Sequence, residues 1–181
     1  MNRFRLLEPC PKQEFVERTG LTLESVQPTI DWAKENNIPT ILDAGSLHKG
    51  TEYLMDKVDY LVASEKFALQ VTKETNPNKM LELIAKVNPQ VVITFGEKGL
   101  IWKMDEATGS YDSFKINAID TTGAGDAFHG AFAYALALEF SWNRILEFSS
   151  AVAALCCTKI GARTGMPYLN EVEDFLSNNR E

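Results

Sequence analysis

The stretch AIDTTGAGDAFHGAFAYAL, residues 118–136, holds the most informative pattern of the chain. It places Gly123 and Gly125 in a short polar segment directly before an apolar run with helical spacing. Glycine permits tight turns and the close approach of a ligand, and the first amides of a helix have no acceptor within it. The stretch therefore predicts a turn and a helix N-terminus that can bind an anion such as a phosphate.

Asp126 follows the second glycine at the same predicted helix start. A carboxylate there could take the proton of a substrate hydroxyl, as phosphoryl transfer requires. The pattern G-x-G-D is by itself more often structural, because Asp is common at helix starts and glycine in turns. No G-K-[ST] follows, and Phe128 stands where G-x-G-x-x-G would need its third glycine. A phosphate site here would belong to another class of nucleotide enzyme.

The rest of the chain alternates helical and strand patterns. Strands are predicted at residues 38–45, 58–64 and 89–96, and a hairpin at 99–104 and 110–117 with 105–110 as its turn. Helices are predicted at residues 22–37, 65–75, 78–88, 124–139, 142–159 and 170–177. This order is typical of an α/β domain whose mostly parallel sheet is flanked by helices.

Three predicted strands end at Asp43, Ser64 and Gly96. Ligands of such sheets bind beyond the carboxyl ends of the strands, so these residues are expected on one rim. His129 follows Asp126 by one helical turn and could face a substrate, but a lone histidine more often has a local role. Residues 1–22 show no clear periodicity and form a poorly specified lead-in segment.

The composition excludes a general affinity for polyanions. The chain has 181 residues, a formal net charge of −7 and 45% hydrophobic residues. Nucleic acids and anionic membranes select clustered positive charge, so neither is an expected partner. No apolar run approaches the ~20 residues of a membrane span. The three cysteines, Cys10, Cys156 and Cys157, imply no disulfide framework, which predicts a cytoplasmic protein.

Residues 120–132, DTTGAGDAFHGAF, closely resemble the C-terminal signature of the PfkB carbohydrate kinases, which form the ribokinase-like superfamily. Three further stretches resemble the family in the same order: IPTILDAGSLHKG at 38–50, VVITFGEKG at 91–99 and AVAALCCTKIGARTGMP at 151–167. The resemblance covers residues 23–181, read as a ribokinase-like nucleotide-binding and catalytic portion. The family's N-terminal third, with most sugar contacts and the lid, is expected to be missing.

The resemblance implies a role for each residue of the glycine turn. Asp126 would be the catalytic base, and the backbone of Gly123, Ala124 and Gly125 would form the anion hole for the transferring phosphoryl group. Mg²⁺ would accompany ATP.

Further residues of the family pattern would hold the nucleotide and a cation. Thr94, Gly96 and Gly99 would lie along the ATP. Asp120 and Thr122 match positions that hold an activating monovalent cation, such as K⁺, in the members that use one.

Two positions depart from the family pattern. An N-x-x-E motif that helps to place Mg²⁺ and phosphates corresponds here to SEKF, residues 64–67, so Ser64 replaces the Asn and Phe67 the Glu. Ser150 stands where many members have an Asn near the adenine. Ser64 and Ser150 are still expected beside the nucleotide, although Phe67 cannot hold metal-bound water.

The expected function is ATP-dependent phosphorylation of a sugar hydroxyl. Two alternatives remain open: a nucleoside kinase of the same superfamily, and a catalytically incompetent fragment that only binds nucleotide or a partner. The expected ligands are ATP and a small-molecule sugar. Such kinases often self-associate, so the resemblance also allows a homodimer, although the lid through which they do so is expected to be missing here.

Overall fold

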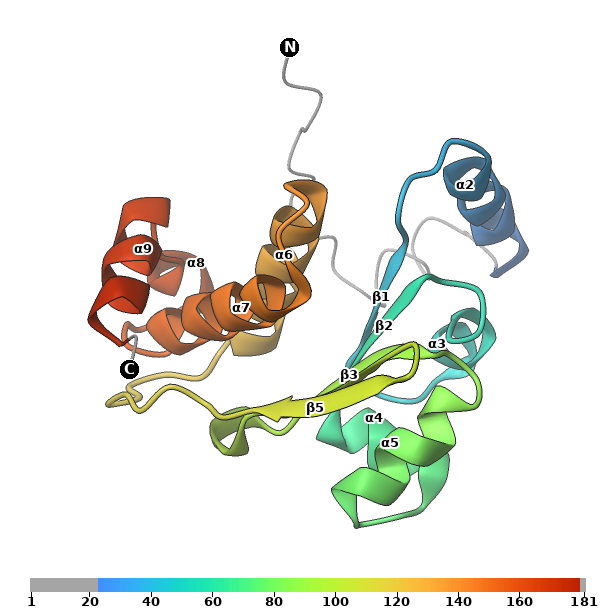
Figure 1. Ribbon diagram of the computed structural model, residues 1–181, viewed down its shortest axis with the longest axis horizontal. Helices are drawn as coiled ribbons and strands as arrows, with labels where there is room; N and C mark the ends of the chain where they lie inside the picture. The colour runs from blue at the N-terminus through green and yellow to red at the C-terminus, as the bar shows by residue number, and fades with distance from the viewer. Residues whose placement is uncertain (1–22, 180–181) are drawn as a thin grey trace. The chain divides into compact units, whose positions relative to one another are not determined.

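The computed structural model describes residues 23–179 of the chain (Figure 1). The chain divides into two compact units, Met1–Thr40 and Ile41–Glu181. In the first unit, helix α2 (Leu23–Glu35), which corresponds to the helix predicted at residues 22–37, buries Ile30 and Ala33. Every other element belongs to the second unit. The predicted division at residue 22 stays a prediction.

The second unit is built on a sheet of five strands in the order β1-β2-β3-β4-β5. Its strands are β1 (Ile41–Ala44), β2 (Tyr60–Ser64), β3 (Gln90–Thr94), β4 (Leu100–Met104) and β5 (Ala107–Tyr111). The first three strands are parallel to one another, whereas β4 and β5 run antiparallel. The parallel sheet with an antiparallel portion is therefore confirmed.

Helices cover both faces of this sheet (Figure 1). The helices on one face are α4 (Glu65–Thr72) and α5 (Pro77–Ala85), and those on the other are α6 (Ala124–Ala137) and α7 (Trp142–Cys156), with α9 (Leu169–Asn178) against α7. The alternation of side chains along a strand divides β2 between two cores. Leu61 and Ala63 pack with α4 and α5, whereas Val62 packs with α6 and α7.

Local sequence signals determine where α4 and α5 begin. The Ser64 hydroxyl accepts a hydrogen bond from the Phe67 amide, and the Asn76 side chain accepts one from the Lys79 amide. Pro77 follows Asn76 at a first helical position, where its missing amide proton costs nothing. Two short helices were not predicted, α3 (Lys49–Leu54) and α8 (Ala162–Gly165).

The hairpin differs from the prediction. Met104 pairs with Ala107, so the turn is Asp105–Glu106 rather than residues 105–110, and β5 ends at Tyr111. The sequence ATGS looks like a turn but lies in a strand, because Gly109 makes room for the Trp102 ring. A Cβ at Gly109 would come within 2.7 Å of that ring. Residues 112–118 consequently form an extended segment that belongs to no strand.

Across residues 23–179, no helix combines the length and the apolar character that crossing a membrane demands.

Candidate functional site

Gly123 makes the turn that starts α6. Its backbone is left-handed, with φ 79° and ψ 3°, a conformation that other residues adopt only with strain. A Cβ at Gly123 would also overlap the Cβ of Ala162 in α8. The fold therefore requires glycine here twice, for the backbone angle and for the contact with α8.

Gly125 and Asp126 lie in the first turn of α6, and both are exposed. A Cβ at Gly125 would meet no other atom within 4 Å, so the protein itself does not require glycine at this position. The Ala124 amide already donates to the Thr121 carbonyl, at an N–O distance of 3.2 Å. First-turn amides and the positive end of the helix dipole make this turn suitable for an anion.

A pocket of about 490 Å³ lies beside this turn, a volume typical of small-ligand sites. Its wall comes from the end of β3, the β3–β4 turn, the extended segment 113–118, α6 and α7. The pocket brings together six of the predicted site residues, namely Thr94, Gly96, Gly99, Ala124, Gly125 and Ser150.

The β3–β4 turn shapes one wall of the pocket. It is a short 3-10 helix, Gly96–Lys98, and both Gly96 and Gly99 have positive φ, 61° and 87°. A Cβ at Gly99 would overlap the Tyr111 carbonyl of β5, so this glycine allows the hairpin to close tightly. The Thr94 hydroxyl donates to the Ala63 carbonyl at 3.3 Å, which ties the ends of β2 and β3 together.

Part of the pocket's lining is a largely apolar flank, of which residues 151–167 were singled out from the sequence but residues 112–118 were not. It is formed by Phe114, Ile116, Ala153, Ala154 and Cys157. Burial, and then the neighbouring Cys156 and Asp120, raise the pKa of the Cys157 thiol. A neutral thiol among apolar side chains suits a flat aromatic ligand such as a nucleobase. Phe114 and Ile116 were not expected here because residues 110–117 were predicted to form a strand of the hairpin.

Ser64 and Phe67 have structural roles. The Ser64 hydroxyl donates to the Gly45 carbonyl at 2.8 Å and accepts from the Phe67 amide at 3.1 Å. Ser64 does not line the pocket. The side chain of Phe67, a residue of α4, is fully buried in the core that α4 and α5 form with the sheet. The nucleotide contact expected of Ser64 stays a prediction.

Asp120 organises the segment before α6. Its carboxylate accepts hydrogen bonds from the Thr122 amide at 2.9 Å and from the Gly161 amide at 2.8 Å. Hydrogen bonds from the side chain and backbone of Thr122, and then from Gly161, hold the pKa of Asp120 below its ordinary value. An ionised carboxylate keeps further acceptor positions, so a cation at Asp120 and Thr122 is compatible with this geometry.

The residues present fit a magnesium ion that arrives with its nucleotide. Between residues 23 and 179, no group of three or more His, Cys, Asp or Glu side chains is placed to hold a metal. Mg²⁺ usually binds through one or two carboxylates together with substrate phosphates and water. Asp126, beside the pocket, is a carboxylate that could supply one such ligand.

His129 reaches across the fold, which the sequence alone did not indicate. It lines the pocket, and its ring lies 3.3 Å from a carboxylate oxygen of Asp43. The two residues are far apart in the sequence, and the pairing of β1 with β2 together with the packing of α6 on the sheet brings them into contact.

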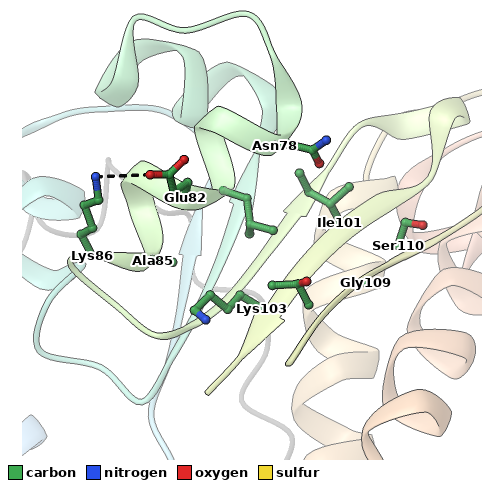
Figure 2. Close-up of a pocket in the computed structure, with 10 residues that line it drawn as sticks. Asn78, Glu82, Ala85, Lys86, Ile101, Lys103, Gly109 and Ser110 are labelled. Carbon is green, nitrogen blue, oxygen red and sulfur yellow. Dashed lines mark ion pairs between the residues drawn. The ribbon is translucent and has the colours of Figure 1, made fainter. Parts of the chain in front are cut away.

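A second hollow, of about 690 Å³, lies between α5 and the β4–β5 hairpin (Figure 2). Its lining mixes apolar side chains, such as Leu81 and Ile101, with polar and charged ones, among them Asn78, Lys103 and the ion pair of Lys86 with Glu82 at 3.6 Å. None of the predicted site residues lines it.

Comparison with known proteins assigns the chain to one family. The family model described as pfkB family carbohydrate kinase matches residues 11–169 and so begins within the lead-in segment. The ribokinase of Lactococcus lactis is 33% identical over 80% of this chain and 47% of that protein. The chain spans about half the length of the curated relatives it matches.

Solved structures agree with the sequence comparison. The ribokinase of Thermotoga maritima superposes with a TM-score of 0.75 and 31% identity, over 86% of this chain and 54% of the other. The Arabidopsis thaliana ribokinase complexed with ribose and ATP gives a TM-score of 0.74 and 28% identity, over 85% and 51%. With a family match over most of its length and a ribokinase-like fold, this chain belongs to the pfkB family of carbohydrate kinases.

Proposed function

We propose that this chain carries the nucleotide-binding and catalytic part of an ATP-dependent kinase that phosphorylates a sugar hydroxyl. One observation carries the proposal: at the start of α6, Asp126 directly follows Gly125, which lines the pocket and has no protein atom within 4 Å of the place where a Cβ would stand. A base and an anion site thus stand side by side at a helix N-terminus. Phosphoryl transfer needs both within reach of one another.

In the proposed reaction, a sugar hydroxyl gives its proton to Asp126 as its oxygen attacks the γ-phosphorus of ATP. The new bond joins the sugar oxygen to phosphorus, and the bond to the β-phosphate oxygen breaks to release ADP. The amides of Gly123 and Gly125 and the helix dipole stabilise the charge on the transferring group, since the Ala124 amide already donates to the Thr121 carbonyl. Mg²⁺, when bound, neutralises part of the phosphate charge.

The pocket suits the rest of the nucleotide. The base would lie against the apolar flank formed by Phe114, Ile116 and Ala153, with Ser150 as a nearby polar group. The phosphates would extend past Gly96 toward the first turn of α6. A relative that is named for its complex with ribose and ATP supports this choice of ligands.

One observation favours nucleotide binding without turnover as a second candidate. Phe67 is fully buried where the family motif has its Glu, and the Ser64 hydroxyl is engaged in capping α4. Neither side chain can help to place Mg²⁺ in the way the motif implies. The cytoplasmic location, the homodimer and the use of K⁺ stay predictions.

A sugar panel with an isosteric variant tests the proposal. Phosphorylation of ribose, deoxyribose, fructose and a nucleoside is measured for the wild type and for Asp126→Asn. Asp174→Asn is the matched control, because Asp174 is exposed on α9. Loss of a general base lowers turnover by about 10²- to 10⁴-fold, so Asp126→Asn should fall by this factor and Asp174→Asn should not. Equal turnover in both variants would refute the role of Asp126. ADP binding without turnover would favour the second candidate.

A further inference from the structure

His129 lies one turn after Asp126 in α6 and contacts three different elements. Its Nδ1 is 2.6 Å from the Gly125 carbonyl in the first turn of α6. Its Nε2 is 3.2 Å from the Val62 carbonyl of β2 and 3.3 Å from the Asp43 carboxylate of β1. The His129 side chain is only 14% exposed and that of Asp43 23%, so water competes little for these contacts.

All three partners of the ring are hydrogen-bond acceptors. A neutral imidazole has one N–H donor and one acceptor nitrogen, whereas the imidazolium has two donors. With one proton on Nδ1 for Gly125, a neutral ring would point the lone pair of Nε2 at two oxygen atoms. A second proton on Nε2 turns this repulsion into a charge-assisted hydrogen bond. The charged form is the one that satisfies every contact.

His48 has the opposite arrangement. Its Nδ1 accepts hydrogen bonds from the amides of Gly50 at 3.2 Å and Thr51 at 3.4 Å, which caps α3. An accepting Nδ1 carries no proton, so His48 must be the neutral ring with its proton on Nε2. These are the two histidines of the chain, and their geometry assigns them different protonation states.

We propose that His129, in its doubly protonated form, is a positioning residue that locks the first turn of α6 to β1 and β2. This turn carries Asp126 and Gly125, so the inference rests on the proposed function for the reaction that it serves. The ring joins the Gly125 carbonyl to both strands. A shift of about 1 Å in a reacting group can cost 10²-fold in rate, so a rigid link at this turn matters.

The charged group that the structure places against the ring is Asp43, from β1. β2 contributes the Val62 carbonyl, and α6 contributes the Gly125 carbonyl and the neighbouring Phe128 ring, 6.1 Å away between centroids. Asp43 therefore selects the charged ring. In Asp43→Asn, the new amide can donate to Nε2, and the ring should become neutral with its proton on Nδ1.

Nitrogen spectra of the two histidine rings test the protonation state directly. The full chain, labelled with ¹⁵N-histidine, is measured at about pH 7.5, where an ordinary histidine is mostly neutral. We expect His129 to show two protonated nitrogens and His48 only a protonated Nε2. A neutral His129 in the wild type would overturn the proposal, as would a ring that stays doubly protonated in Asp43→Asn.

Matched variants test the positioning role. His129→Asn removes the link, whereas His48→Asn keeps a good helix cap and serves as the control. Exchange of the Ala127 amide, which makes the first helical hydrogen bond of α6 to Gly123 at 2.8 Å, should quicken at least about tenfold in His129→Asn only. The Kd for ADP should rise at least about tenfold in the same variant. Unchanged exchange, or an equal rise in Kd for both variants, would refute the role.

The two proposals can fail separately. If the wild type binds no ADP, the proposed function fails, and the ring spectrum and the amide exchange alone decide on His129. If His129→Asn does not fold, the spectra of the wild type and of Asp43→Asn still decide on the protonated clamp.

Discussion

Replacing Gly125 with alanine should make the protein more stable and its phosphate site worse. A Cβ at this position would meet no protein atom within 4 Å, and the Gly125 backbone has no positive φ. Alanine is favoured over glycine in helices by about 0.5 to 1 kcal/mol, with the smaller value expected in a first turn. The melting temperature should therefore rise by about 1–4 °C.

The same methyl group would enter the pocket that Gly125 lines. A phosphate oxygen bonded to the first-turn amides would be pushed away, and the loss of a hydrogen bond to a charged group costs about 1.5–3 kcal/mol. The Kd for ATP should therefore rise about 10- to 150-fold. Calorimetric titration with ATP measures this change, and thermal unfolding followed by circular dichroism measures the stability.

Gly130→Ala is the matched control. Gly130 is exposed in the same helix, has open space around its Cα and does not line the pocket. Both variants should be stabilised, but only Gly125→Ala should lose affinity. If Gly125→Ala binds ATP as tightly as the wild type, the start of α6 does not hold the phosphates. If it is destabilised, the described environment of Gly125 is wrong.

Three further changes test the surrounding structure. Gly123→Ala forces alanine into a left-handed backbone and against α8, which should cost about 2–3 kcal/mol of unfolding free energy in urea titrations. The hydrogen bonds that Asp120 accepts from Thr122 and then from Gly161 lower its pKa in the folded protein. They therefore stabilise the fold at pH values above the pKa of the unfolded chain, about 3.9, and this stabilisation is lost as the pH falls through the lower pKa of the folded state. In Asp120→Asn, the unfolding free energy should fall less steeply than in the wild type as the pH is lowered from about 5. The same dependence on pH in both proteins would refute this. Phe132→Ala, at a fully buried core position, should cost about 3–5 kcal/mol, and a loss below about 1 kcal/mol would show that α6 packs differently.

Strong local signals made most of the fold predictable. Apolar runs between polar turns located β1 to β3, and the helix predicted at residues 78–88 corresponds to α5, which begins at Pro77 and ends at Ala85. The hairpin was placed wrongly because residues 107–110 have turn composition. Their strand conformation depends on the Trp102 ring, which lies across Gly109. A contact between strands of this kind leaves no periodic mark in the sequence.

The candidate site was predictable only in part, for the same physical reason. Thr94, Gly96, Gly99 and Gly125, which the family pattern places beside the nucleotide, line one pocket, and their contact with a nucleotide stays a prediction. The contact of His129 with Asp43 depends on the register of two parallel strands and on the position of α6 above them. No spacing between residues that far apart in the sequence encodes it.

The two glycines of the turn differ in a way that the sequence cannot show. The fold requires Gly123, because any side chain would be strained and would overlap Ala162. Neither the backbone nor the packing requires Gly125, although glycine in a helix lowers stability. A glycine without a structural reason at the edge of a pocket supports the proposal that a ligand occupies the space that a side chain would fill. The helix start thus joins one glycine that builds the turn to one whose open space fits the proposed phosphate site, with Asp126 directly after it.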